Sequence, residues 1–578
     1  MAAYSENQFE NDLISYLTTG EVGMRNGYYR EKIWKYEPDI KTTEQLWDNF
    51  KRILERHNQD KLDKPLSETE FNQIKQEISK LSTPYKAGQF LYGTNGVSEL
   101  EVDMDDGRHV FLKVFDQSQV GGGDTVYQVV NQIQRPAKII GKGDCRFDVT
   151  LLMNGLPIIQ IEEKTTNHEV YEALNQMERY AMEGQYGDIF STLQILIAMT
   201  PYDARYMANM PADRFNKDFA FQWQDKKTNT PVRNWKEFAD AFLSIPMAHR
   251  MSTNYMILDG TKNKESIKVM RPYQVYATES VIDGVKLHDF DFGDNKIGYI
   301  WHTTGSGKTI TSFKTAWLAS RLPNIDKVVF VVDRTALTEQ TAESYKAYDP
   351  DASAFSLGNV RDVANTNDLE RKLKSKDNGI VITSFQKLLR LVGREKFKAP
   401  NKNILFIVDE AHRSVNGEAF RRVKKAFPRG AWVGYTGTPV FNSKEDSTEE
   451  RFGELLHAYT IREAIADKNV LGFKVSFETT LDLENIDSEN VKDYFRQKYP
   501  DMTDQELTEA VNNFQMEKFD DEVGQAFYDY RQDHIQLVVE DIFKHWKNRS
   551  NEGRFNAILT THASGTKPSI PMATQYLE

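Results

Sequence analysis

The chain has 578 residues, of which 39% are hydrophobic and 27% are charged, a balance typical of a folded protein with several domains. The single cysteine, Cys145, excludes an internal disulfide framework, and no signal-like N-terminus or long apolar run suggests export or a membrane span, so we expect a cytoplasmic protein without membrane partners. The net charge of −12 argues against a uniformly basic nucleic-acid binder, although a locally positive groove is compatible with it.

The N-terminus predicts an amphipathic helix. From Glu6 to Leu17, the apolar residues Phe9 and Leu13 follow helical spacing. The same helix carries Glu10, so two acidic side chains are available there.

A β-hairpin is the first element that carries chemistry. Two strand patterns, Arg146 to Met153 and Leu156 to Lys164, flank Asn154-Gly155, which is the strongest short hairpin signal. Counting outward from this turn brings the carboxylates of Asp148 and Glu162 roughly opposite each other.

Side-chain alternation separates the residues of the returning strand. Glu162 and Lys164 lie on one face, and Glu163 lies on the other, which favours Glu162 over Glu163 as a partner of Asp148. Two carboxylates beside a lysine can hold Mg²⁺, with the lysine orienting water or neutralising the transition state. The alternative is a surface hairpin with an ordinary cross-strand ion pair.

A helix pattern from Glu169 to Met182 follows, with Gln176 and Tyr180 four residues apart on one side. The joint order of Asp148, Glu162-x-Lys164 and Gln176-x-x-x-Tyr180 resembles the PD-(D/E)xK nuclease core of the RecB-like type. Such nucleases often have a further acidic residue on an N-terminal helix, a place for which Glu6 and Glu10 compete.

The first domain is expected to continue through a buried strand from Phe190 to Thr200. A polar run from Thr253 to Lys268 then reads as the linker that ends it. We therefore assign residues 1–262 to a PD-(D/E)xK endonuclease domain of the α/β class.

A phosphate-binding loop follows the strand pattern Ile297 to Trp301. Glycines let backbone N–H groups face an anion at a helix N-terminus, the lysine reaches the β- and γ-phosphates, and the threonine ligates Mg²⁺. The residues predicted to bind ATP here are Thr304, Gly305, Ser306, Gly307, Lys308 and Thr309. One departure is His302, which occupies the place of the usual first glycine.

Further motifs stand at the ends of later strand patterns. Asp409-Glu410-Ala411-His412 offers Asp409 for Mg²⁺ and Glu410 for polarising the attacking water, and Thr436-Gly437-Thr438-Pro439 can report the nucleotide state. Upstream, Gln274 offers an amide that suits the edge of adenine.

Together with Asp333-Arg334 and Thr383-Ser384-Phe385-Gln386, these motifs resemble the first RecA-like motor domain of superfamily-two helicases and translocases, which we place at residues 263–465. An ordinary kinase-like nucleotide-binding domain would not carry Asp-Glu-Ala-His and Thr-Gly-Thr-Pro in these places.

Residues 466–578 are expected to begin a second RecA-like motor domain. Thr503 to Glu506 is a capping-box signature, Val523 to Lys547 reads as helical, Phe555 to Thr561 as a strand, and Ser569 to Glu578 as helix-like. Superfamily-two motors complete their ATP site with arginines in a Gln-x-x-Gly-Arg pattern, which is not found after Phe555. The resemblance thus implies a C-terminally truncated chain, with an incomplete second domain and weak ATP hydrolysis by itself.

An N-terminal nuclease followed by this motor resembles the R (HsdR) subunit of type I restriction-modification enzymes, because type III restriction subunits have their nuclease at the C-terminus. The resemblance implies ATP and Mg²⁺ as cofactors, translocation of double-stranded DNA, methyltransferase (M) and specificity (S) subunits as partners, and cleavage away from the recognition site by Asp148, Glu162 and Lys164.

Two alternatives stay open from the sequence. A repair-type helicase-nuclease would use the same two sites on free DNA ends without methyltransferase partners. A non-catalytic protein would keep the hairpin only as a DNA-binding relic.

Overall fold

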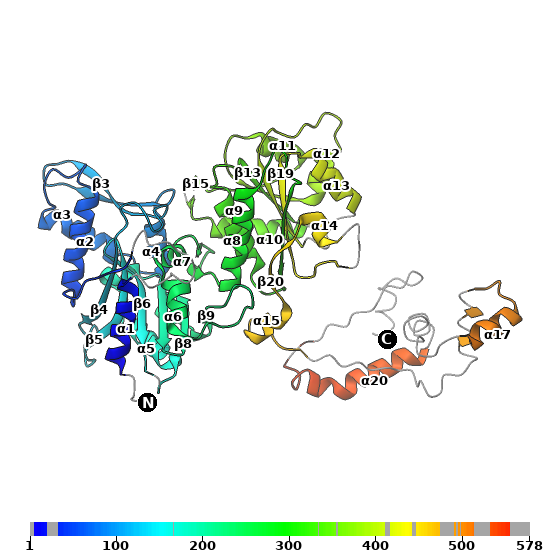
Figure 1. Cartoon of the computed structure of the whole chain (residues 1–578), viewed down its shortest axis with the longest axis horizontal. Helices are drawn as coiled ribbons and strands as arrows, with labels where there is room; N and C mark the ends of the chain where they lie inside the picture. The colour runs from blue at the N-terminus through cyan, green and yellow to red at the C-terminus, as the bar shows by residue number, and fades with distance from the viewer. Residues whose placement is uncertain are drawn as a thin grey trace. The chain divides into compact units, whose positions relative to one another are not determined.

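The computed structural model describes residues 5–19, 33–165, 167–332, 335–353, 356–410, 417–441, 447–473, 491–492, 495–496, 499–513, 532–554 and 556. The chain divides into two compact units, Met1–Leu471 and Gly472–Glu578. The first unit contains two seven-stranded sheets, one near the N-terminus and one that follows residue 295 (Figure 1). Its class is mixed α/β, as the sequence predicts.

The N-terminal sheet has the strand order β1-β4-β5-β6-β7-β8-β9. Its strands are β1 (Lys35–Tyr36), β4 (Tyr127–Arg135), β5 (Cys145–Met153), β6 (Leu156–Glu163), β7 (Ile195–Thr200), β8 (Asp203–Ala208) and β9 (Phe221–Gln222). Strands β4, β5 and β6 are antiparallel neighbours, whereas β6 and β7 are parallel. A parallel pair needs a crossover, and helix α5 (Val170–Met182) provides it.

The hairpin between β5 and β6 is confirmed. Asn154 and Gly155 both have positive φ, 52° and 82°, as a type I′ turn requires. Val149 pairs with Ile161, so the next position outward sets Asp148 against Glu162.

Helices α1 and α5 pack on opposite faces of this sheet. Helix α1 (Glu6–Thr18) begins with a capping box at Ser5 and contacts the face that carries Asn131, whereas Gln176 of α5 reaches Glu162 on the other face. The N-terminal part also contains α2 (Thr43–His57), α3 (Glu68–Ser79), α4 (Pro84–Tyr92), a hairpin of β2 (Val97–Asp103) and β3 (His109–Asp116), α6 (Trp235–Phe238) and α7 (Ile245–Ser252).

Two sequence-based expectations for this part are wrong in detail. The predicted strand Phe190 to Thr200 starts as a 3₁₀ turn, Asp188–Thr192, in which the Thr192 hydroxyl donates to the carbonyl of Ile189 at 3.0 Å, and only β7 is extended. The predicted linker contains a hairpin of β10 (Met256–Asp259) and β11 (Ser266–Val269), whose apolar side chains are buried despite the polar residues between them.

The second sheet is wholly parallel, with the order β16-β17-β13-β18-β19-β12-β20. Its strands are β12 (Lys296–His302), β13 (Lys327–Val332), β16 (Val360–Asp362), β17 (Ile380–Ser384), β18 (Ile404–Asp409), β19 (Gly430–Thr436) and β20 (Leu455–Tyr459). In a parallel sheet all carboxyl ends meet at one edge, so the predicted strand-end motifs share that edge.

Helices connect and cover the parallel strands, and Figure 1 shows α8 and α9 running beside each other. They are α8 (Pro272–Leu287), α9 (Lys308–Ala319), α10 (Thr335–Tyr348), α11 (Thr366–Lys374), α12 (Phe385–Val392), α13 (Gly417–Ala426), α14 (Thr448–Phe452) and α15 (Ile461–Ala466). The same unit contains a short antiparallel pair of strands, β14 (Ala352–Ser353) and β15 (Ser356–Leu357).

In the second unit, the structure describes α17 (Asp504–Asn512), which begins with the predicted capping box at Thr503, and α20 (Gln532–Arg549). The predicted strand from Phe555 to Thr561 and the helix-like end from Ser569 fall outside the described residues, apart from residue 556. Among the helices that are described, none has the length and apolar composition needed to cross a bilayer.

The hairpin turn gives a first testable prediction. A Cβ at Gly155 would approach the Cα of Phe50 in α2 to 2.9 Å, in addition to the strain of a positive φ. Gly155→Ala is expected to lower the free energy of unfolding by roughly 2 kcal/mol or more, measured by urea denaturation. Gly184→Ala is the matched control: its φ is also positive but the space around it is open, so a loss of about 1 kcal/mol is expected. Equal losses would show that contact with α2 does not constrain the turn.

Candidate active sites

The first candidate site is the pair Asp148 and Glu162 on neighbouring strands. Glu162 is fully buried, and its two oxygens accept hydrogen bonds from Gln160 Nε2 at 3.0 Å and from Gln176 Nε2 at 2.8 Å. Asp148 Oδ2 accepts a hydrogen bond of 2.9 Å from the backbone N–H of Glu163. The two carboxyl groups that the sequence predicts to meet are thus in contact, each held by other donors.

Electrostatics shows that these carboxyl groups suit a cation. Burial raises the pKa of Glu162 well above its ordinary value, and the charge of Asp148 raises it further. Burial also raises the pKa of Asp148, although the Glu163 N–H and Lys164 oppose the rise, and the two side chains hydrogen-bond each other. A divalent cation between the two carboxyl groups would relieve the repulsion that raises these pKa values.

Lys164 lies just beyond the end of β6 and joins the pair to helix α1. Its Nζ donates to the carbonyl of Glu163 at 2.8 Å and forms an ion pair of 3.5 Å with Glu6 Oε1. Glu10, the other acidic residue of α1, is buried and accepts hydrogen bonds from Asn131 and Gln132. Both candidates on the N-terminal helix therefore lie near the site, through different contacts.

Glu163, on the opposite face of β6 from Glu162, is buried. It is 1% exposed, and neither of its carboxyl oxygens has a hydrogen-bond partner. Burial raises its pKa well above the ordinary value of 4.5, and the charges of Asp148 and Glu10 add to this. The alternation of faces was read correctly, but helix α1 covers the second face.

Gln176 and Tyr180 form a positioning chain behind Glu162. Gln176 Nε2 donates to Tyr180 Oη at 2.6 Å, and the tyrosine hydroxyl donates to the carbonyl of Arg146 at 3.1 Å. Because Arg146 is on the same strand as Asp148, helix α5 ties the two strands that carry the carboxylates.

Some residues of this site were not found from the sequence. Gln160 shares a face with Glu162, so strand alternation could have identified it. Asn131 and Gln132 gave no local signal, because their contact with Glu10 joins segments 121 and 122 residues apart.

Few protein side chains at this site could bind a metal ion. Across the part of the chain that the structure describes, no group of three or more His, Cys, Asp or Glu side chains is arranged to hold a metal ion. Two carboxylates would leave most of the coordination shell to water and substrate, which suits Mg²⁺.

The second candidate site is the loop between β12 and α9. Gly305 and Gly307 have φ of 85° and 82°, and Gly307 caps the helix in the left-handed conformation. The hydroxyl of Ser306 donates to the carbonyl of Thr303 at 2.6 Å and closes the loop. Thr304 and Thr309 are exposed and Lys308 is half-buried, so the predicted phosphate ligands line one open turn.

His302 explains how the loop forms without its usual first glycine. The side chain is fully buried, and its Nε2 lies 3.1 Å from His457 Nδ1 on β20. Residue 302 is still part of β12, paired with Tyr459, so its side chain packs into the sheet. Burial lowers the pKa of His302 well below its ordinary value, which keeps the imidazole neutral beside the loop.

Acidic residues at the end of β18 face the loop. Glu410 Oε1 forms an ion pair of 3.6 Å with Lys308 Nζ, and Glu410 has a φ of 50°, a strained conformation of the kind found at functional sites. Burial and then the charge of Glu410 raise the pKa of Asp409 to about 6. A Cβ at Gly437 would lie 3.5 Å from Lys308 Nζ, so the turn after β19 also reaches the loop.

Gln274 contacts the loop directly. Its Nε2 donates to the carbonyl of Ser306 at 3.1 Å, and its Oε1 accepts from the N–H of Arg271 at 3.0 Å. The residue also lines a cavity of about 750 Å³, shared with Gly305, Gly307 and Ile310, which is large enough for a nucleoside. Adenine recognition by Gln274 stays a prediction. Asp333-Arg334 and Ala411-His412 of the predicted motifs lie outside the described residues.

Two protein families match separate parts of the chain. The family described as type I restriction enzyme R protein N terminus (HSDR_N) matches residues 3–215, and the SWI2/SNF2 ATPase family matches residues 273–508. The chain is 33% identical, over 93% of its length, to the type I restriction enzyme SsaAORF53P endonuclease subunit of Staphylococcus saprophyticus, of which it covers 52%.

Two further relatives are also endonuclease subunits of type I restriction enzymes. Identity to the SauMSSORF170P endonuclease subunit of Staphylococcus aureus is 32% over 97% of this chain and 54% of that protein. The C-terminal part of a putative type I restriction enzyme from Mycoplasma pneumoniae, the MpnIIP endonuclease, is 36% identical over its full length and 36% of this chain. The chain spans about half the length of the two staphylococcal relatives.

The unpaired buried carboxyl of Glu163 predicts a specific pH dependence. Because its pKa is raised in the folded state, the folded protein is destabilised as the pH rises above the unfolded value of 4.5. Glu163→Gln should therefore raise the melting temperature at pH 7–8 and change it little near pH 4. The control is the exposed Glu172, because a hydrogen bond from His168 lowers its pKa. Glu172→Gln should therefore not raise the melting temperature at pH 7–8. A Glu163→Gln protein that melts lower at pH 8 would contradict the burial argument.

Proposed function

Since the chain belongs to the endonuclease (R) subunits of type I restriction enzymes, we propose that it uses ATP hydrolysis to translocate double-stranded DNA and cleaves it away from the recognition site. We assign the nuclease to residues 1–262, the first motor domain to residues 263–465 and the start of a second motor domain to residues 466–578. The proposal rests most on one observation, the contact between the carboxyl groups of Asp148 and Glu162 beside Lys164.

The nuclease chemistry follows from the residues around this pair. Mg²⁺ held by Asp148 and Glu162 would activate water and stabilise negative charge on the scissile phosphate. Gln176 holds the Glu162 carboxylate in orientation, and Tyr180 anchors Gln176 to β5. Lys164, within 3.5 Å of Glu6, is free to exchange that exposed partner for a phosphate oxygen and neutralise it.

The motor chemistry is assigned to the loop and its facing strand ends. Thr304 to Gly307 cradle the phosphates of ATP, Lys308 contacts the β- and γ-phosphates, and Thr309 with Asp409 would hold the Mg²⁺ that ATP brings. Glu410 polarises the attacking water. Its ion pair with Lys308 supports this, because an incoming γ-phosphate competes for the lysine and releases the carboxylate.

The partners follow from the family. Specificity and methyltransferase subunits would hold the recognition site while this chain moves the duplex, in the cytoplasm where chromosomal DNA is reached. Nuclease and motor in one chain would let translocation bring DNA to Asp148 and Glu162.

Two lysines test the division of labour. With the M and S subunits present, Lys164→Ala should lower DNA cleavage at least about 100-fold while ATP hydrolysis continues, because the lysine acts only at the scissile phosphate. Lys308→Ala should abolish both activities, because cleavage depends on translocation. Phosphate release and nicking of plasmid DNA are the two measurements, and Lys142→Ala, an exposed lysine paired with Glu183, is the control.

The DNA substrate separates this proposal from a nuclease that acts on DNA ends. A translocating restriction enzyme cleaves closed circular DNA that carries a recognition site. If the assembled enzyme degraded linear DNA from its ends and left circles intact, the restriction function would be refuted.

A further inference from the structure

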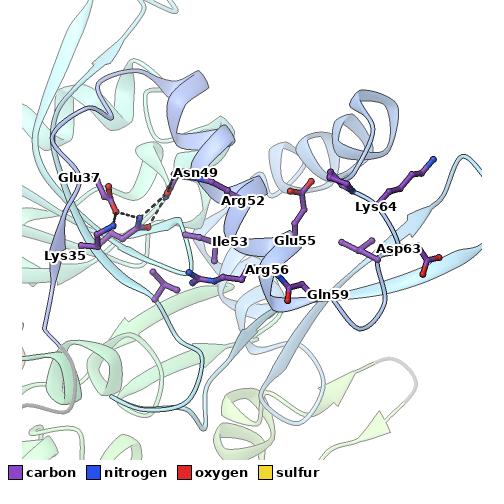
Figure 2. A pocket seen from close by; sticks show the side chains of 14 residues that line it. Lys35, Glu37, Asn49, Arg52, Ile53, Glu55, Arg56, Gln59, Asp63 and Lys64 are labelled. Atoms are coloured by element: carbon purple, nitrogen blue, oxygen red, sulfur yellow. Dashed lines mark hydrogen bonds and ion pairs between the residues drawn. The ribbon is translucent and has the colours of Figure 1, made fainter.

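A cavity of about 610 Å³ opens on the N-terminal part of the chain and shares no residue with the two sites described above (Figure 2). Helix α2 forms one wall, with Asn49, Arg52, Ile53 and Arg56. The other walls are β1, the start of β4, and the loop that follows α2, which contributes Lys64.

The acidic residues of this cavity are already engaged. Glu37 accepts hydrogen bonds from Lys35 at 2.7 Å and from Gln128 at 3.2 Å. Glu55 accepts from the backbone N–H of Leu66 at 2.9 Å, and Asp63 forms an ion pair of 2.9 Å with Arg108.

The arginines of α2 are less fully compensated, although the charge of Arg52 is among the causes that lower the pKa of Glu37. Arg52 donates to the neutral amide of Asn49 at 2.9 Å, and no carboxylate among the described residues forms an ion pair with Arg56. One helical turn separates the two guanidinium groups, so they project from the same side of α2. In a chain with a net charge of −12, two arginines at a hollow that form no ion pair among the described residues favour an anionic ligand.

Arg52 is held in position by Asn49, which is itself held by Gln128. Asn49 and Gln128 are 1% and 3% exposed and exchange hydrogen bonds of 2.9 and 3.1 Å between their amides. Asn49 can therefore hold the guanidinium of Arg52 at a defined place. An arginine that is already ordered loses less side-chain entropy when it binds an oxyanion.

The rest of the cavity is suited to an apolar body. Ile53, Leu62, Pro65 and Val126 line it between the charged groups. A phosphate on the arginines would leave room for a sugar and a base against these side chains.

We propose that this pocket binds a phosphate-bearing ligand of nucleotide size, with Arg52 and Arg56 as the phosphate ligands and Lys64 at the rim. The ligand is either a free nucleotide or one nucleotide unit of a DNA strand. Both present the same phosphate, sugar and base. Strand β4 links the pocket to the carboxylate site, because Asn131, which contacts Glu10, lies three residues after Gln128, or about 10 Å along the strand.

The test compares the chain carrying Lys308→Ala, which weakens nucleotide binding at the motor loop, with the same chain that also carries Arg52→Ala and Arg56→Ala. The probes are dAMP and a fluorescent single-stranded 20-mer, measured by calorimetry and by anisotropy over a range of salt concentrations. Arg371→Ala with Lys374→Ala is the charge-matched control, because both side chains lie on the exposed face of α11. Melting temperatures check that each variant folds.

If DNA is the source, the arginine variant should bind the 20-mer at least about 10-fold more weakly, and its log–log salt slope should fall by about 1.4, for two lost phosphate contacts. If a free nucleotide is the source, dAMP binding should be lost while DNA binding is retained. The charge-matched control should change either affinity less than about 2-fold. Binding of both probes that is unchanged by the arginine substitutions would overturn the proposal.

Discussion

The β5–β6 hairpin constrains the whole nuclease part of the chain. Its two-residue turn pairs Met153 with Leu156, and a register shift between Leu151 and Leu152 then sets Asp148 against Glu162. Without that shift of one residue the two side chains would lie on opposite faces. The turn is closed on one side by α2, which lies against Gly155. The contact between the two carboxyl groups therefore depends on a short turn, whose conformation glycine supplies, together with the register shift that follows it.

The buried carboxyl groups at the end of β6 reduce the stability of this region at neutral pH. Glu162 and Glu163 are both inside, and the pKa of each is raised by burial and by neighbouring negative charge. Such a cluster destabilises the folded chain at neutral pH unless a cation or protons compensate it. Hydrogen bonds from the amides of Gln160 and Gln176 offset part of that cost at Glu162, whereas Asn131 and Gln132 donate to Glu10.

The parallel sheet also brings charged side chains together. Its carboxyl edge gathers the loop after β12, the acidic end of β18 and the turn after β19, which come from distant parts of the chain. Lys308 and Glu410 form an ion pair there, whereas Asp148 and Glu162 bring two like charges together with Lys164 beside them. A neutral His302, packed against His457, completes the support of the loop.

The sequence by itself determined the local elements: the β5–β6 hairpin, the helix that carries Gln176 and Tyr180, and the glycine-rich loop before α9. Each depends on residues close together in the chain, whose turn chemistry and periodicity are visible without a structure. Only the tertiary structure decided that Glu163 is buried under α1, that Asn131 and Gln132 hold Glu10, that residues 256–269 form a hairpin, and that Arg52 and Arg56 border a cavity. These features depend on contacts between segments far apart in sequence, and no local pattern records which distant surface will cover a given face.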